Sequence, residues 1–188
     1  MKRIQRPCRT ASRGFTLVEM MATLAVAGTL ITTGVTSLQA LLGNNRLATQ
    51  ANVLMHSIML ARSEAIRRNA RVTLAKVGEH WESGWIGFVD SNANARLDDG
   101  EELLLTQGPL PGNLRLTANR GVRDYISYTA QGRAQRVSGA FQAGRLMLCD
   151  HHEEATPHHA RAIIISGSGR PRVSSRKRDL RDCTKGRA

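Results

Sequence analysis

The chain has 188 residues, of which 41% are hydrophobic, and it carries a net charge of +12. That length favours a single domain with at most an appendage. The charge distribution excludes a uniformly basic surface, because residues 1–14 carry +5, residues 161–188 carry +7 and the stretch between them sums to zero. The two basic ends therefore need separate explanations.

A long apolar run follows the basic N-terminus. The 23 residues from Met20 to Leu42 carry no charge, which is enough for a helix that crosses a bilayer. The positive charges before it favour the cytoplasmic side. The change from polar to apolar sequence falls at Gly14-Phe15, before this run, whereas a secretory cleavage site would follow it. We therefore expect residues 1–14 to be a cleaved leader and residues 15–42 to stay on the mature chain as a transmembrane or filament-core helix.

One carboxylate, Glu19, lies near the start of this segment, at the fifth position of the expected mature chain. An ionised group on a membrane-spanning helix costs free energy, so it usually has a partner. In a pack of parallel helices, the new N-terminal amine of a neighbouring subunit could neutralise it. The alternative is a plain signal anchor in which the glutamate is incidental.

The residues "RGFTLVEMM" resemble the prepilin signature of type IV pilins and type II secretion pseudopilins. This resemblance implies cleavage after Gly14 by a prepilin peptidase, N-methylation of Phe15, and an assembly role for Glu19 in a thin filament of pilin or pseudopilin subunits. It implies an inner-membrane protein with a single span and a periplasmic head, which then enters an extracellular pilus or a periplasmic pseudopilus.

The next segment, residues 43–70, predicts an amphipathic helix that continues the first one, from about Phe15 to about Asn69. One apolar stripe is formed at helical spacing by Leu47, Ala51, Leu54, Ile58, Ala61 and Ala65. We expect this stripe to pack on a sheet.

Residues 71–188 predict a head of short strands between turns rich in Gly, Asn and Asp. The expected strands are Arg71–Val77, Trp85–Val89, Leu103–Thr106, Leu114–Thr117, Tyr125–Tyr128, Arg145–Cys149 and Ala162–Ser166. A long helix followed by a run of strands favours an α+β fold.

Three stretches, "ARSEAIRRNARVTL", "WESGWIGFVDSNANARLDDGEELL" and "LCD…ARAIIISGSGRPR", are similar to the GspH/FimT branch of minor pilins and pseudopilins. The resemblance implies a pilin-like fold, with a long N-terminal helix packed on an antiparallel β-sheet head. Members of this branch are low-abundance subunits at or near a filament tip, and some prime assembly. The FimT-type subunit is associated with DNA uptake in natural transformation through a "GRxR" stretch, which Gly169-Arg170-Pro171-Arg172 matches.

The basic C-terminal segment is the candidate DNA-binding site. In an extended segment, Arg170 and Arg172 would project to one side. Their guanidinium groups suit phosphate oxygens, and Arg176, Lys177 and Arg178 would enlarge the positive patch. No aromatic residue follows Phe141, so base-stacking platforms are missing from this segment. We therefore expect non-specific backbone binding, with duplex DNA as the favoured ligand. The alternative is a solvated, partly disordered tail.

The number of cysteines left after cleavage agrees with an exported protein. Cys8 leaves with the leader, and Cys149 and Cys183 remain as a pair that an oxidising compartment would close into a disulfide. Two free thiols are the alternative.

Two further signals are weak. Residues 90–101 imitate a calcium loop through Asp90, Asn92, Asn94, Asp98 and Glu101, but Ala95 stands where such loops need glycine; an Asn/Asp-rich hairpin loop is the preferred interpretation. The run "CDHHEEATPHH" could capture zinc, although a solvated loop is preferred. We expect no metal, no cofactor and no catalytic residues, because neither a phosphate loop nor a nucleophile elbow is present.

The sequence therefore predicts a non-enzymatic minor type IV pilin of the FimT type that binds extracellular DNA. One alternative is a minor pilin that primes assembly without binding DNA. The other is a type II secretion pseudopilin of the tip complex.

Overall fold

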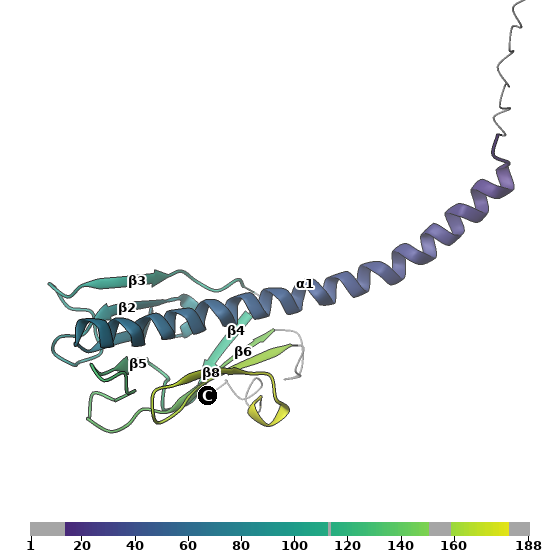
Figure 1. Ribbon diagram of the computed structural model, residues 1–188. Coiled ribbons are helices and arrows are strands. Elements are labelled where there is room, and N and C mark those ends of the chain that lie inside the picture. Colours follow the sequence, from purple (N-terminus) through teal and green to yellow (C-terminus); the bar gives the residue numbers. More distant parts are fainter. Residues whose placement is uncertain (1–13, 113, 151–158, 181–188) are drawn as a thin grey trace, which may run out of the picture. The chain divides into compact units, whose positions relative to one another are not determined.

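The structure is a computed structural model, and it describes residues 14–112, 114–150 and 159–180, with only the backbone described at 32–37, 39 and 40. The chain divides into two compact units, Met1–Leu41 and Leu42–Ala188. Figure 1 shows the order of the elements along the chain.

The first element is the long helix α1, Leu17–Arg68. At its start, the backbone N–H of Glu19 donates to Thr16 Oγ1 over 3.3 Å. This is half of a Thr-x-x-Glu capping box. At its end, Asn69 has φ +50°, and Ala70 N donates to Ala65 O over 3.2 Å. These are the features of a Schellman ending with asparagine in the left-handed position. The predicted limits of the helix are confirmed to within two residues.

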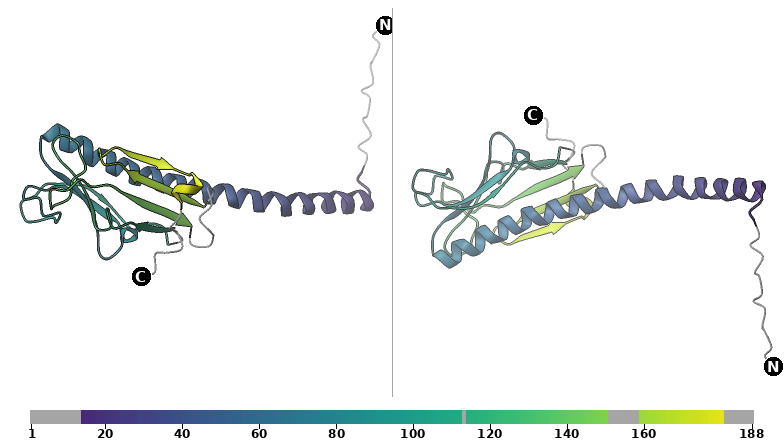
Figure 2. Two further views of the ribbon diagram at one scale, coloured as in Figure 1. Left: turned by 90° about the horizontal axis from the view of Figure 1, so that it is seen from below. Right: turned by 90° about the horizontal axis from the view of Figure 1, so that it is seen from above.

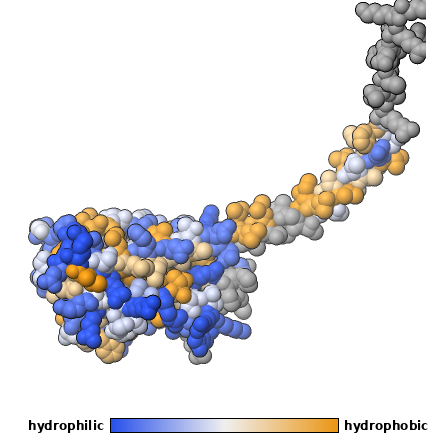
Figure 3. All heavy atoms as spheres, viewed as in Figure 1, coloured by the Kyte–Doolittle hydropathy of each residue, from blue (hydrophilic) through white to orange (hydrophobic). Residues whose placement is uncertain are grey.

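In the first unit, the large apolar side chains of α1 are mostly exposed, and Figure 3 shows them along the first part of the helix. They are between 56% and 77% exposed, for example Leu17, Met21, Leu24 and Leu30. Among the helices of the described residues, none has a stretch both long and apolar enough to cross a membrane.

In the second unit, the predicted stripe of α1 is buried. Leu47, Ala51, Leu54, Ile58, Ala61 and Ala65 are all 1% exposed or less. Arg62 and Arg68 lie off the stripe and are only partly exposed, and Arg67 is exposed. The expectation that this face packs on the head is confirmed, since all six residues belong to the main core.

The head contains two four-stranded antiparallel sheets, and Figure 2 shows both of them against the C-terminal half of α1. The first sheet has the order β3-β2-β1-β5 and the second has the order β4-β6-β7-β8. The strands are β1 (Val72–Lys76), β2 (Trp85–Val89), β3 (Leu103–Gln107), β4 (Leu114–Ala118), β5 (Tyr125–Tyr128), β6 (Gly144–Asp150), β7 (Ala160–Ile165) and β8 (Pro171–Ser174).

All seven predicted strands are present with small changes at their ends. The eighth, β8, was not among them. It is an edge strand that pairs with β7 from Ala162↔Ser174 to Ile165↔Pro171. A short strand that begins with proline has little strand signal of its own, and an edge position is where a sheet tolerates proline.

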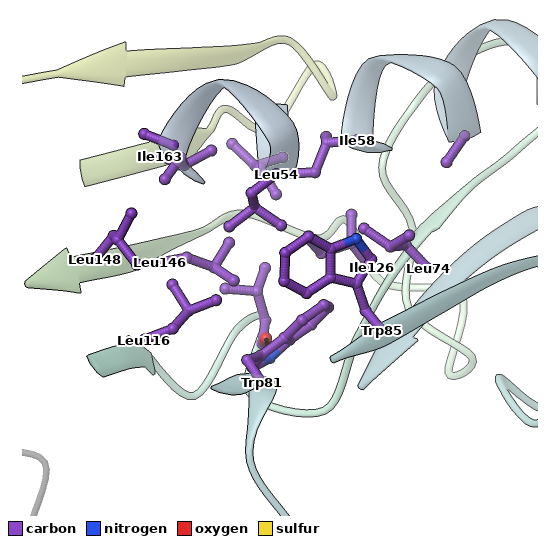
Figure 4. Close-up of a cluster of buried hydrophobic side chains, with 14 of the residues drawn as sticks. Leu54, Ile58, Leu74, Trp81, Trp85, Leu116, Ile126, Leu146, Leu148 and Ile163 are labelled. Atoms are coloured by element: carbon purple, nitrogen blue, oxygen red, sulfur yellow. Dashed lines mark hydrogen bonds between the residues drawn. The ribbon is translucent and has the colours of Figure 1, made fainter. Parts of the chain in front are cut away.

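The main core lies between α1 and both sheets, and Figure 4 shows its centre. Leu54 and Ile58 of α1 meet Leu146 and Ile163 of the second sheet there. Two tryptophans lie in the same cluster, with ring centroids 6.4 Å apart: Trp85 of β2 and Trp81 of the short helix η1 (Trp81–Ser83). Burying large apolar side chains contributes about 1.5 to 3 kcal/mol each, so this core holds α1 and the two sheets together as one unit.

Candidate nucleic-acid interface

The turn between β7 and β8 begins the candidate site. Gly169 N donates to Ser166 O over 2.8 Å, and Ser166 N donates to Arg170 O over 3.1 Å. Gly169 has φ +81°. A tight turn followed by a left-handed glycine is a usual way to close a short hairpin. The "SGSGR" stretch therefore forms a defined turn that leads directly into β8.

Gly169 is also buried against the loop that follows β5. A Cβ atom at this position would lie 2.7 Å from both the Ala134 backbone nitrogen and the Gly132 carbonyl oxygen, and 3.1 Å from the Tyr128 ring. The loop itself is tied to α1, since Arg62 Nε donates to Gly132 O over 2.9 Å. Only glycine permits this close approach, which fixes the turn on the head.

Arg170 and Arg172 are both exposed. Arg170 precedes β8 and Arg172 lies within it. The Arg172 guanidinium is 3.4 Å from Asp179 Oδ2. That carboxylate also accepts a 2.6 Å hydrogen bond from Ser174 Oγ. This hydrogen bond, together with the nearby Arg172 charge, holds the pKa of the Asp179 carboxyl below its ordinary value of 3.8.

The structure describes the chain after β8 to Leu180. This part of the chain forms a short helix, η2 (Lys177–Asp179), with Arg176 as the preceding residue. Leu180 is 1% exposed and packs with Met147, Ala160 and Ala162 in a second hydrophobic cluster. These strand residues alternate with those facing α1, so the cluster lies on the opposite face of the second sheet. Residues 171–174 form a strand and residues 177–179 a short helix, so this part of the segment has a defined structure, although most of its side chains are exposed.

Arg176, Lys177 and Arg178 are exposed around this packed segment. Five basic side chains between Arg170 and Arg178 thus lie on a supported surface, and Asp179 is the one acidic residue between 159 and 180. We call these five residues and Asp179 the C-terminal basic segment.

The sequence prediction missed one arginine beside this segment. Arg145 of β6 donates from Nη1 to the Asp179 carbonyl oxygen over 2.7 Å. It pairs with Ile164, which in turn pairs with Arg172. Directly paired residues share a face of a sheet, so Arg145 and Arg172 lie on the same side. The strand register that joins them is a tertiary property, and no local pattern around Arg145 reveals it.

The predicted disulfide is only half within the described residues. Cys149 is 3% exposed and belongs to the same cluster as Leu180. Cys183 lies outside the described residues, so the pairing stays a prediction.

The calcium-like loop forms its own hydrogen-bond network. The buried Asp90 carboxylate accepts from Thr73 Oγ1, Asn94 N and Ala95 N at 2.7 to 3.1 Å. Asp98 accepts from the amides of Asn92 and Asn94. These bonds lower the pKa of Asp98. The carboxylates are therefore occupied by donors of the loop and its neighbours, as the hairpin-loop interpretation expects.

Most of the histidine-rich run, residues 151–158, lies outside the described residues. Among the described residues, no group of three or more His, Cys, Asp or Glu side chains is placed to hold a metal ion.

At the other end, Gly14 and Phe15 precede α1, and Phe15 is 72% exposed. Glu19 lies in the first turn of the helix, where a negative charge is favoured by the helix dipole. The Thr16-x-x-Glu19 spacing was available in the sequence as a helix-start signal. It gives Glu19 a local role in addition to any role in assembly.

A long N-terminal helix whose second half packs on antiparallel sheets defines a pilin-like protein. The family model described as type II transport protein GspH matches residues 50–169. A second model, the prokaryotic N-terminal methylation motif, matches residues 9–35. Because the first match spans more than half of the chain, the chain belongs to the GspH family, which the resemblance in sequence predicted.

Solved structures show the same fold. The type IV minor pilin FimU of Pseudomonas aeruginosa has a TM-score of 0.53 at 19% identity, covering 69% of this chain and 89% of that one. The minor pseudopilin EpsH of the Vibrio cholerae type 2 secretion system has a TM-score of 0.50 at 12% identity, covering 69% and 96%. At these identities the likeness concerns the fold alone.

A curated relative, the pilin-like protein PilA1 of Thermus thermophilus, is 44% identical over 92 residues. The match covers 48% of this chain and 56% of the relative, so the chain spans about half the length of the curated relative it matches.

Proposed function

We propose that this chain is a minor type IV pilin that binds extracellular DNA without sequence preference through its C-terminal basic segment and so supports DNA uptake in natural transformation. The arginine side chains would contact phosphate oxygens, and released counterions would supply most of the affinity. Retraction of the pilus would then draw the bound DNA inward.

One observation carries this proposal. Arg170, Arg172, Arg176, Lys177 and Arg178 are exposed on a segment that is fixed to the head at both ends, by Gly169 and by Leu180. Charges on a fixed support lose less conformational entropy on binding than charges on a loose tail. The segment therefore has the features of a phosphate-binding surface.

The N-terminal motif supports the export and assembly part of the proposal. A prepilin peptidase would cut after Gly14 and methylate Phe15. The large apolar side chains that the structure describes between residues 15 and 41, such as Phe15, Leu24 and Leu30, are exposed. They would be covered by the inner membrane and afterwards by other pilin subunits in the filament. Glu19 would pair with the N-terminal amine of a neighbouring subunit.

The test is the affinity of the full chain, in a neutral detergent, for duplex DNA. The double variant Arg170→Ala/Arg172→Ala should weaken binding roughly tenfold or more, because hydrogen bonds between charged groups contribute about 1.5 to 3 kcal/mol each. The matched control is Arg96→Ala/Arg123→Ala, which removes the same charge from exposed positions elsewhere on the head. Equal losses of DNA affinity in both double variants would show that only net charge matters, which would contradict the proposal.

A second candidate function is a minor pseudopilin of a type II secretion system. The family description and the fold of EpsH favour it. In that case the chain would contact other pseudopilins and bind no DNA. Secretion by the system would depend on its N-terminal segment. Secretion genes beside its own gene would support this function, and pilus genes would oppose it.

A further inference from the structure

Among the described residues of the head, one aromatic side chain, Phe141, is largely exposed. Phe141 is 73% exposed, whereas Phe88 of β2 is fully buried. A single exposed apolar residue is common on protein surfaces, so exposure alone does not define a site. Its surroundings decide whether it has a role.

The residue after it explains why the ring is held in solvent. Gln142 is 1% exposed. Its Oε1 accepts from Ser127 N over 2.9 Å, and its Nε2 donates to the carbonyl oxygens of Gly121 and Tyr125 at 3.1 and 2.8 Å. Every one of these bonds draws the Gln142 side chain into the head. Successive side chains of an extended segment point to opposite sides, so Phe141 points outward.

The ring lies beside the turn between β7 and β8, which leads into the C-terminal basic segment. Its Cδ2 atom is 3.7 Å from the position that a Cβ atom would have at Gly167. Phe141 and Gly167 line one hollow of about 360 Å³ together with residues that include Arg133 and Gln135. The backbone contact of Gly169 with Gly132 and Ala134 holds the two segments together at a second point. The ring and the turn thus form one surface.

Both segments that contribute to this surface are rich in basic residues. Residues 125–149 contain three arginines and no acid, and residues 159–178 contain six basic residues and no acid. Arg133 is exposed on the Phe141 side, and Arg170 is exposed three residues beyond Gly167. An exposed ring that shares a hollow with Arg133, next to the turn that leads to Arg170, complements a ligand that has flat apolar rings and a negative backbone.

We propose that Phe141 and the β7–β8 turn form a stacking subsite for an unpaired nucleobase, so that the C-terminal basic segment takes single-stranded DNA. A phenyl ring stacks on any base, and guanidinium groups on either side contact the phosphates. Bases in a duplex are already stacked on each other and would leave Phe141 unused. This inference rests on the proposed DNA-binding function, and it replaces duplex DNA, which we expected from the sequence, as the favoured ligand.

Three probes of equal length separate stacking from charge: an oligothymidylate, the same strand without bases, and a duplex. Phe141→Ala in the full chain should weaken oligothymidylate binding roughly five- to a hundredfold. Binding of the abasic strand and of the duplex should not change. Phe141→Trp should preserve binding, and Phe141→Leu should lose it, because leucine keeps apolar area without a π face. Val137→Ala is the control, since Val137 is 46% exposed in the same loop.

Unchanged oligothymidylate binding by Phe141→Ala would overturn the subsite, as would wild-type binding by Phe141→Leu. If the wild-type chain binds the oligothymidylate no more tightly than the abasic strand, the subsite falls and the DNA-binding function stands. If it binds none of the probes, both fall. A Phe141→Ala chain that binds all three probes normally but no longer assembles into filaments would assign the ring to a subunit contact and overturn the inference.

Discussion

Two charged regions of the head differ in what their charges contact. In the loop of residues 90–101, the carboxylates of Asp90 and Asp98 accept hydrogen bonds from nearby backbone and amide donors. In the C-terminal basic segment, the basic side chains are exposed, and Arg172 forms an ion pair with the Asp179 carboxylate over 3.4 Å. Both regions looked like ligand sites in the sequence.

The difference shows that charge alone does not mark a site. Carboxylates that accept hydrogen bonds from their own loop stabilise its conformation. In the function we propose, basic side chains held on a packed support would donate to the phosphates of DNA. The support depends on the uncharged residues Gly169 and Leu180.

The largest expected effect comes from Gly169→Ala. The new Cβ would lie 2.7 Å from two backbone atoms, at a φ of +81° that disfavours side chains. We expect a loss of roughly 2 to 6 kcal/mol in the free energy of unfolding, from backbone strain and overpacking together. Chemical denaturation measures it. Gly167→Ala, two residues away with its nearest contact at 3.7 Å, is the control and should unfold like the wild type.

Leu180→Ala removes the buried side chain that packs the end of η2 against the second sheet. A buried leucine replaced by alanine costs about 2 to 5 kcal/mol. DNA binding should weaken as well, although every basic side chain is retained. A variant that loses stability yet binds DNA with wild-type affinity would show that the support is irrelevant to binding.

Asp90→Ala removes hydrogen bonds from the loop of residues 90–101. It leaves Thr73 Oγ1 and two backbone N–H groups without their acceptor, which should cost about 1 to 3 kcal/mol. DNA affinity should not change, and calcium should not alter the melting temperature of the wild-type chain. Calcium-dependent stabilisation that Asp90→Ala abolishes would contradict our interpretation of this loop.

The smallest effect concerns Asp179. Because its pKa is below 3.8 in the folded chain, its ion pair with Arg172 is present at neutral pH, and its contribution to stability is lost only as the pH falls through the lowered pKa. Asp179→Asn should free Arg172 and strengthen DNA binding roughly two- to fivefold, the range of an exposed ion pair. At pH 7, a weaker affinity in this variant would indicate that Asp179 positions Arg172.

Much of the fold follows from local pattern. The stripe from Leu47 to Ala65 repeats at helical spacing, and each of its residues is buried. The strand from Trp85 to Val89 lies where apolar and β-branched residues predict it. Such features depend on the chain near them, so sequence reasoning reaches them.

The site is less predictable, because its parts meet through tertiary contacts. β8 pairs with β7, and the local sequence does not reveal this pairing. Arg145 joins the basic surface through the register of β6 and β7. Phe141 is distant in sequence from Gly167, so a search for aromatic residues in the C-terminal segment passes over it.

The salt dependence of DNA binding tests the central claim most directly. Each phosphate contact contributes about 0.9 to the slope of log K against log salt for duplex DNA, and about 0.7 for a single strand. If Arg170 and Arg172 grip phosphates, the double variant Arg170→Ala/Arg172→Ala should reduce the slope by roughly 1.4 to 1.8, while Arg96→Ala/Arg123→Ala leaves it unchanged. An identical slope in wild type and in the Arg170/Arg172 variant would contradict the account.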